Sequence, residues 1–331
     1  MIDLPHGGAL DAVRKLFPDA PEPWLDLSTG INPFVYPNLS VSPERLHSLP
    51  TASLMADCRD AMAGAWGADP TAIAPTPGSE LVIRHLPQWV PGRRVGLADF
   101  SFADHEAAWH AAGREVVLAD DPADLAGGVD VLVVVNPNNP DGRLRTRARM
   151  EDLLVRQRAC GGVLIADEAF VDTCPEHSLC GLAGTPGLIV LRSAGKFFGL
   201  AGLRLGALLG DPELLARWLD FSGHWPVSGP ALEIGARMYR DADWMSETRE
   251  RLSHWSEQVR VALTNVSVGI VGGTGLFTLV RVENAERTWE VLARRGLYVR
   301  RFAADNRVLR IGLPPDEAAL DRLMAAFRIF L

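Results

Sequence analysis

The chain has 331 residues, of which 47% are hydrophobic, so it is long enough for a large and a smaller domain with sizeable cores. Its formal net charge of −8 speaks against a nucleic-acid-binding surface, because such surfaces gather Lys and Arg on one face. Apolar runs are far shorter than the roughly 20 residues of a membrane span, and the N-terminus lacks a signal-peptide pattern. We therefore expect a cytoplasmic protein that acts on a small molecule.

The chain contains four cysteines, without a CxxC pair and without histidines at zinc-ligand spacing beside them. This pattern predicts reduced structural thiols and no metal site.

Taken in chain order, the first fifty residues are rich in proline and predict an extended arm. From about residue 93, short β-branched runs alternate with amphipathic stretches, which is typical of a mostly parallel sheet covered by helices. Most of the runs are apolar without alternation, as expected for strands buried on both faces. The predicted strands are 93–98, 115–118, 129–136, 162–167, 188–192 and 205–209, with 193–204 as a loop between the last two.

The second part of the chain predicts more helix. Asp211 followed by Pro212 predicts a capped helix start, and helical patterns follow around 230–240 and 245–263. Strands at 275–283 and 308–313 with a helix at 285–295 between them predict a βαβ-like tail. We expect an N-terminal arm at 1–35 that belongs to the small domain, a large domain at 36–220 and a small C-terminal domain at 221–331.

Four polar segments follow predicted strands, where open α/β sheets bind ligands. They are 136–142, 167–170, 193–196 and Arg204. Each has an ordinary alternative, since Asn-Pro and Asp-Gly pairs form turns, an aspartate can cap a helix, and a lysine in a glycine-rich loop is commonly solvated.

Together these segments supply what pyridoxal 5′-phosphate (PLP) chemistry requires. Lys196 is the amine that can hold the cofactor as a Schiff base, and Asp167 is the carboxylate that can keep the pyridine nitrogen protonated. Ser193 and Arg204 can hold the phosphate.

The motifs NPNNPxG, DEAF, SxGK and GLRLG occur in this order, and the chain resembles fold-type I PLP enzymes of the class I/II aminotransferase superfamily over nearly its whole length. The resemblance implies an α/β fold of the fold-type I PLP-dependent transferases. Its large, PLP-binding domain has a mostly parallel sheet sandwiched by helices, and its smaller C-terminal domain is α+β. It also implies a homodimer with active sites at the subunit interface.

The resemblance further implies roles for single residues. Asn139 is expected to hydrogen-bond the 3′-oxygen of PLP, and Phe102 to stack on the ring. The backbone of Gly78, Ser79 and Glu80 is expected to cradle the phosphate at a helix N-terminus. Arg310 matches the arginine that binds the substrate α-carboxylate. On sequence alone, Phe102 could equally be a core residue and Arg310 a surface residue.

Three positions depart from the pattern of many relatives. Phe170, a cofactor-binding position, replaces a tyrosine, so a hydroxyl to the 3′-oxygen is missing. Asp141 stands where aminotransferases usually have threonine. Trp66 is a candidate for the aromatic residue that reaches the partner's site.

Within the superfamily the chain most resembles the threonine-phosphate decarboxylases of cobalamin biosynthesis and, slightly less, the histidinol-phosphate aminotransferases. The resemblance rests on His6-Gly-Gly, on the segment 26–33 and on DEAF with phenylalanine. It implies a PLP-dependent lyase that converts L-threonine O-3-phosphate to (R)-1-amino-2-propanol O-2-phosphate. Candidate residues for binding a phosphorylated amino acid are His6, Asn32, Arg300, Arg301 and Arg310.

Three alternatives remain open from the sequence. Transamination differs from decarboxylation in which bond of the α-carbon is aligned for cleavage, and the sequence does not fix that alignment. A PLP-binding scaffold without turnover would carry a basic DNA-binding domain, which this chain lacks. A dinucleotide site is a poor match, because the glycines at 273 and 275 lack the third glycine of that motif.

Overall fold

The computed structural model describes residues 6–330, which divide into two compact units. The larger unit comprises Val35–Asn139 and Arg143–Glu247. The smaller unit combines the segment up to Phe34, the short segment Pro140–Gly142 and the chain from Thr248 onward. The domain limits expected at residues 35 and 220 stay a proposal beside this division.

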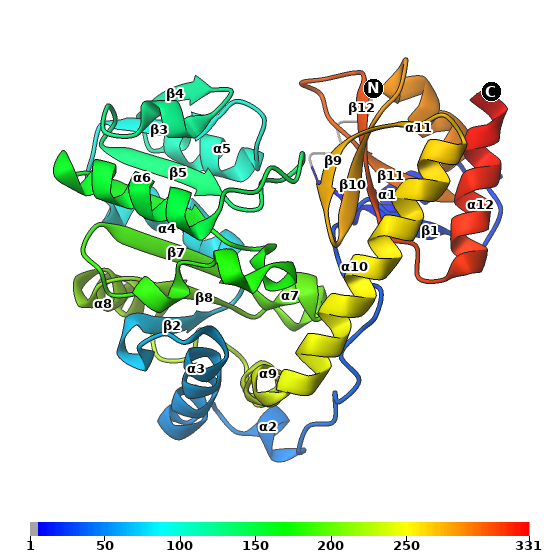
Figure 1. Cartoon of the computed structure of the whole chain (residues 1–331). Coiled ribbons are helices and arrows are strands. Elements are labelled where there is room, and N and C mark those ends of the chain that lie inside the picture. The colour runs from blue at the N-terminus through cyan, green and yellow to red at the C-terminus, as the bar shows by residue number, and fades with distance from the viewer. Residues whose placement is uncertain (1–5, 331) are drawn as a thin grey trace. The chain divides into compact units, whose positions relative to one another are not determined.

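The larger unit is a helix-covered sheet (Figure 1). Its helices are α2 (Glu44–His47), α3 (Ala52–Trp66), α4 (Ser79–Trp89), α5 (Ala103–Ala111), α6 (Arg147–Ala159), α7 (Ala194–Phe197), α8 (Pro212–Ser222) and α9 (Gly229–Arg240). Its strands are β2 (Ile73–Thr76), β3 (Arg94–Ala98), β4 (Glu115–Ala119), β5 (Val131–Val135), β6 (Val163–Asp167), β7 (Leu188–Ser193) and β8 (Gly206–Leu209).

The seven strands are hydrogen-bonded in the order β2-β8-β7-β6-β5-β3-β4. Five neighbouring strands, from β7 to β4, are parallel, whereas β8 runs antiparallel to both β7 and β2. The strand ends that follow β2, β3, β5, β6 and β7 therefore lie at one edge of the sheet, together with the start of β8. This confirms the predicted mostly parallel sheet.

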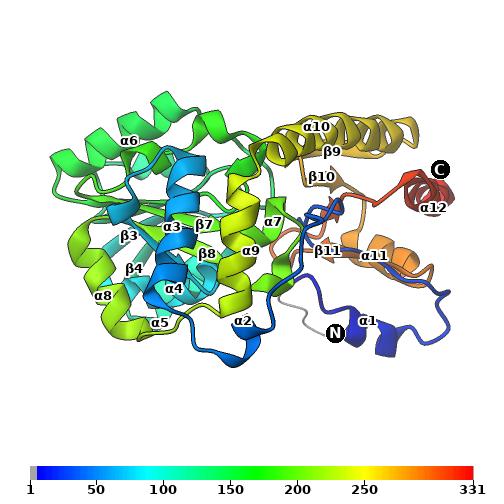
Figure 2. The same ribbon diagram turned by 90° about the horizontal axis from the view of Figure 1, so that it is seen from below.

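Helices cover both faces of this sheet, with α6 on one side and α4, α5 and α8 on the other (Figure 2). The strand β5, Val-Leu-Val-Val-Val, is buried at every position, as a strand covered on both faces must be. Trp109 of α5 and Trp218 of α8 are fully buried against the sheet with the apolar face of α4. This core fixes the edge at which the strand ends meet.

The smaller unit is built on a five-stranded sheet in the order β1-β11-β12-β10-β9. Its strands are β1 (Leu25–Leu27), β9 (Gly269–Thr274), β10 (Phe277–Arg281), β11 (Leu297–Arg301) and β12 (Val308–Gly312). Its helices are α1 (Leu10–Leu16), α11 (Ala285–Ala293) and α12 (Glu317–Phe327), while α10 (Ala242–Asn265) begins in the larger unit and continues into the smaller one.

Two expectations from the sequence are wrong. The described part of the first fifty residues is not extended throughout, because it includes α1, the sheet strand β1 and the short helix α2. The predicted βαβ tail has the wrong second strand, because β10 and β12 are antiparallel neighbours. The unforeseen strand β11 pairs antiparallel with the other side of β12, so it runs parallel to β10 and completes the βαβ unit through α11. A period-2 pattern identifies a strand without specifying its neighbour, which explains the second error.

The loop predicted at 193–204 is also partly regular, since it contains the one-turn helix α7 and a 3₁₀ turn at Ala201–Leu203. The remaining predicted strands and helices are present, with ends shifted by a few residues. Within residues 6–330 no helix combines the length and the hydropathy needed to cross a bilayer.

Candidate active site

All the residues predicted to bind the cofactor belong to the larger unit, and the sheet brings them to one edge. The register aligns Thr76, Gly206 and Ser193 across β2, β8 and β7, and Asp167 aligns with Leu191 on β7. Neighbouring strands thus deliver the serine before Lys196, the carboxylate of Asp167 and the start of α4 to the same edge.

One corner of this edge is a cradle for an anion. Gly78 precedes α4 with a φ of +85° and gives the helix no side-chain cap, so the first N–H groups of α4 are available to a ligand. A Cβ at Gly78 would lie 3.0 Å from Nη2 of Arg204, so the guanidinium sits directly over this turn. Arg204 itself has a φ of +52°, a conformation that is uncommon outside glycine and is found at functional sites.

The carboxylate of Glu80 cannot itself donate to a phosphate. It pairs with Arg84 at 3.0 Å and lies 4.0 Å from Nη2 of Arg204. Its predicted contribution, a backbone N–H, is compatible with that arrangement. The cradle therefore brings together helix N–H groups and one arginine, which are donors that suit a phosphate, and Ser193 stays the predicted third donor.

Asp167 ends β6 and is 2% exposed. Its Oδ1 accepts a hydrogen bond from the N–H of Ala169 at 3.1 Å, and its Oδ2 lies 2.9 Å from Nε2 of His105, which is also fully buried. His105 belongs to α5, which begins directly after Phe102, and its ring meets that of Phe102 edge-on at 6.2 Å. The carboxylate is therefore held in one orientation by two contacts.

The contact with His105 was not predicted, although the residue lies three positions after Phe102. Residues three apart share a helix face, and that spacing is the signal that could have identified it.

Lys196 lies in α7, directly after β7, and its Nζ is 5.6 Å from the centre of the Phe170 ring. The two residues that follow, Phe197 and Phe198, are buried. Phe198 stacks on Trp244 with ring centres 5.5 Å apart, so the helical turn that carries Lys196 is anchored in an aromatic core. Lys196 is partly buried on this anchored turn and stays the predicted amine for the cofactor.

The loop after β5 is held by two of its asparagines. Asn136 exchanges side-chain hydrogen bonds with the backbone of Arg145, and Asn138 contacts Ser101 and the carbonyl of Phe100. These contacts fix the turn around Asn139, which is only partly buried. Asn139 stays the predicted partner of the cofactor's 3′-oxygen.

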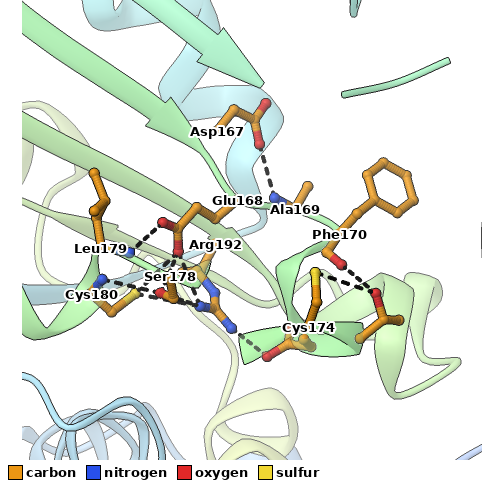
Figure 3. Close-up of polar contacts among 11 residues, drawn as sticks. Asp167, Glu168, Ala169, Phe170, Cys174, Ser178, Leu179, Cys180 and Arg192 are labelled. Atoms are coloured by element: carbon orange, nitrogen blue, oxygen red, sulfur yellow. Dashed lines mark hydrogen bonds and ion pairs between the residues drawn. The ribbon is translucent and has the colours of Figure 1, made fainter. Parts of the chain in front are cut away.

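Behind the edge, Glu168 and Arg192 form a buried ion pair that the sequence reading did not identify. Glu168 points away from Asp167, toward Ser178, Leu179, Cys180 and Arg192 (Figure 3). Trp66 belongs to the same region, because the guanidinium of Arg192 lies 4.7 Å from the centre of its ring. Trp66 thus packs within its own chain.

The smaller unit gathers several of the predicted substrate residues. Arg310 on β12 is buried and donates from Nη2 to the carbonyl of Ser28 at 2.8 Å. The hydroxyl of Ser28 in turn accepts from the N–H of Gly8 at 2.8 Å, and the carbonyl of His6 accepts from Tyr298. The His6-Gly-Gly motif therefore lies beside the backbone that Arg310 holds.

Arg300 and Arg310 are register partners on β11 and β12. Burial, and then the charge of Arg300, lower the pKa of Arg310 to about 10. Two cations directly opposite each other destabilise a sheet, and an anion between them would remove that cost.

The other two predicted residues have different surroundings. Arg301 has the next position on the strand and therefore faces away from Arg310. It lies 3.5 Å from Glu286, and its guanidinium is 4.9 Å from the ring centre of Trp289 on α11. Asn32 is buried and accepts from the N–H of Phe34 at 2.8 Å, which holds the end of the 26–33 motif.

Comparison with known proteins identifies the family. The model of the family "Aminotransferase class I and II" matches residues 23–327. The chain belongs to this family. Family members use PLP, so the predicted cofactor is confirmed, and so is the fold-type I architecture.

Individual relatives differ in similarity. The chain is 39% identical to a threonine-phosphate decarboxylase of Sinorhizobium sp, over 97% of this chain and 96% of that protein. It is 29% identical to a histidinol-phosphate aminotransferase of Mycobacterium bovis, over 93% of this chain and 85% of that protein. In fold it is similar to the histidinol-phosphate aminotransferase of Clostridium acetobutylicum, with a TM-score of 0.83, 19% identity, and coverage of 92% of this chain and 98% of that one.

The site geometry fits the cofactor of the class I and II aminotransferase family. Gly78 leaves room beneath Arg204 that a Cβ would narrow, as a phosphate cradle requires. Asp167 is a buried carboxylate with a fixed orientation, which suits an ion pair with a ring nitrogen. Lys196 lies in α7, just after β7, which is the strand next to the one that ends at Asp167. In this family member, the donors and the acceptor that PLP needs are thus present together in one unit.

Proposed function

We propose that this enzyme decarboxylates L-threonine O-3-phosphate to (R)-1-amino-2-propanol O-2-phosphate, as a PLP-dependent lyase of cobalamin biosynthesis. The observation that carries the proposal is the identity of 39% to a threonine-phosphate decarboxylase over nearly the full length of both chains. Identity to a histidinol-phosphate aminotransferase is ten percentage points lower, over a smaller share of both chains.

The arginines of the smaller unit support a substrate with two anionic groups. In the proposal Arg310 binds the α-carboxylate, and Arg300, its register partner, binds the phosphate with help from His6 and Asn32. Arg301 faces the other side of the sheet, toward Glu286 and Trp289, and has no part in this binding. Arg310 is buried beside the second cation, Arg300, and both effects disfavour its charged form. A bound anion would offset this cost. A phosphorylated amino acid supplies an anion for each arginine.

The larger unit supplies the chemistry. When bound, the cofactor provides an electron sink that weakens one bond of the substrate's α-carbon. Asp167 holds the positive charge at the far end of that sink, and the cradle of Gly78, Ser193 and Arg204 anchors the phosphate. Lys196 holds the cofactor and delivers a proton from Nζ to the carbon that has lost CO₂.

A second candidate is an aminotransferase of the histidinol-phosphate type. It is supported by the identity of 29% to the histidinol-phosphate aminotransferase of Mycobacterium bovis over 93% of this chain. In that case Lys196 would act as the general base that removes the α-proton, and Arg310 would bind the carboxylate.

The proposal includes a homodimer that completes its active sites across the interface, and a cytoplasmic location. Apolar side chains at Leu46 and Leu49 are strongly exposed in the single chain, which supports a partner surface in this region.

One experiment separates the two candidate reactions. The purified enzyme, loaded with PLP, is incubated with L-threonine O-3-phosphate, and release of CO₂ is measured with the Lys196→Ala variant as the control. The proposal predicts stoichiometric CO₂ without any amino acceptor. Amino transfer to 2-oxoglutarate from histidinol phosphate, without CO₂ from threonine phosphate, would establish the aminotransferase instead.

A further inference from the structure

Three buried charged residues, Glu168, Asp172 and Arg192, form what we call the buried charge array. Each is at most 3% exposed. Nη2 of Arg192 donates to Oδ1 of Asp172, and Nη1 lies 3.3 Å from Oε2 of Glu168. Glu168 directly follows Asp167 and Arg192 directly precedes Ser193, so the array adjoins the cofactor edge, with Glu168 pointing away from Asp167 (Figure 3).

Glu168 is held by donors from several directions. Its Oε1 accepts from the N–H of Leu179 at 2.6 Å, and its Oε2 accepts from the hydroxyl of Ser178 at 2.6 Å. The thiol of Cys180 points at the same oxygen from 3.6 Å, and burial raises the pKa of this thiol to about 12, so it remains a donor. A carboxylate with this many directed contacts has one position.

Strand geometry connects the array to the cofactor edge. Successive residues of a strand point to opposite faces, so Glu168 points away from Asp167 and Arg192 points away from Ser193. The N–H of Glu168 donates to the carbonyl of Leu191 at 2.9 Å, which joins the two strands at this level. The array therefore holds the two strand ends that carry Asp167 and Ser193 in place, through contacts on the opposite face of the sheet.

The array also fixes the turn that follows β6. Arg192 contacts Glu168 at the start of this turn and Asp172 at its end, and Phe170, whose ring lies 5.6 Å from Nζ of Lys196, stands between them. A planar guanidinium that donates through both of its NH₂ groups fixes the distance and the angle between the two carboxylates that it binds. An apolar contact fixes neither.

Burying these three charges is an expensive way to stabilise a fold. Charged groups lose their hydration on burial, and replacing such a group with uncharged residues is often neutral for stability. The geometry that the array imposes on the cofactor edge is therefore a better reason for its presence than stability.

We propose that the buried charge array consists of positioning residues that hold Asp167, Phe170 and the Ser193–Lys196 segment in the arrangement that PLP binding requires. The inference rests on the cofactor shared by the family and not on the choice of substrate. It is therefore tested without substrate.

The test removes the charges while preserving shape. A triple variant, Glu168→Gln with Asp172→Asn and Arg192→Met, leaves no uncompensated buried charge and keeps an acceptor for the N–H of Leu179. The apo protein's melting temperature, the dissociation constant for PLP and the visible circular dichroism of bound PLP are measured. Arg240→Met is the matched control, because it breaks an exposed pair with Asp57 in the same unit.

The proposal predicts that the triple variant folds with a melting temperature near that of the unmodified enzyme. Its dissociation constant for PLP should rise about 10- to 100-fold, the usual effect of removing groups that orient a binding residue. The visible circular dichroism should fall, because that signal reports a fixed cofactor orientation. Arg192→Lys, which keeps the charge and loses the two-pronged contact, should show a smaller loss, and Arg240→Met none.

A triple variant that folds and binds PLP with unchanged affinity and unchanged circular dichroism overturns the proposal. If the triple variant does not fold, Arg192→Lys decides. A rise of at least threefold in its dissociation constant supports positioning, and an unchanged constant refutes it. Failure of threonine phosphate to release CO₂ would leave these binding results unaffected, so the two proposals fail independently.

Discussion

Replacing Asp167 with asparagine removes a charge and almost nothing else. Asparagine has the same shape, its oxygen can still accept from the N–H of Ala169, and its NH₂ can donate to Nε2 of His105 once the imidazole changes tautomer. Asp167 is 2% exposed, so no water can replace the lost charge at the ring nitrogen. We therefore expect Asp167→Asn to fold as well as the unmodified enzyme.

The expected losses can be estimated. A hydrogen bond to a charged group contributes about 1.5–3 kcal/mol to the free energy of binding. Its loss corresponds to a fall in PLP affinity of roughly 10- to 100-fold. Turnover should fall further, on the order of 10²- to 10³-fold, because the charge matters most when electrons flow into the ring. CO₂ release at saturating PLP measures turnover, and fluorescence titration of the apoenzyme measures affinity.

Asp211→Asn is the control for this experiment, because its side chain caps α8 through the N–H of Leu214 and asparagine caps a helix equally well. It should change neither quantity. Turnover within fivefold of the unmodified enzyme in Asp167→Asn, with PLP saturating, would refute the assigned role of the carboxylate.

Three further predictions concern other parts of the site. Lys196→Ala should abolish both CO₂ release and the borohydride-sensitive absorbance of bound PLP, and a variant that kept either would exclude Lys196 as the covalent anchor. Gly78→Ala places a Cβ at a φ of +85° and 3.0 Å from the guanidinium of Arg204, so PLP affinity should fall by about tenfold or more. In the control Gly64→Ala the new Cβ meets nothing within 4 Å, so the free energy of unfolding should rise by about 0.4–1 kcal/mol in thermal unfolding. Because burial first and Arg300 second lower the pKa of Arg310 to about 10, its charge is present below that pH and lost above it, so KM for threonine phosphate should rise as the pH passes 10. In Arg300→Met the same rise should occur at higher pH, and an unmoved profile would show that the two arginines are not coupled.

The cofactor edge could be predicted because its residues occupy short, ordered motifs next to strands. Lys196, Asp167 and Ser193 each follow an apolar run whose burial on both faces identifies it as a central strand. Once the strands are parallel, their ends meet at one edge, so sequence order alone brought these three side chains together.

The contacts behind that edge could not be predicted in the same way. Arg192 and Glu168 are 24 residues apart, and a charged residue in a strand is ordinarily exposed. Only the register of β6 against β7 and the turn at Asp172 make them a buried pair. Likewise, the neighbour of β12 depended on strand pairing, which periodicity does not encode.

The smaller unit's sheet also has a consequence for synthesis of the chain. Its edge strand β1 pairs in parallel with β11, and the partner of Leu25 is Leu297. Leu297 is synthesised about 270 residues after Leu25, so this pairing forms late. At roughly 5–20 residues per second, translation separates the two strands by about 15 to 50 seconds. During that interval the larger unit, whose last strand β8 ends at Leu209, can complete its own sheet. β1 must therefore stay unpaired in this sheet until β11 has been synthesised.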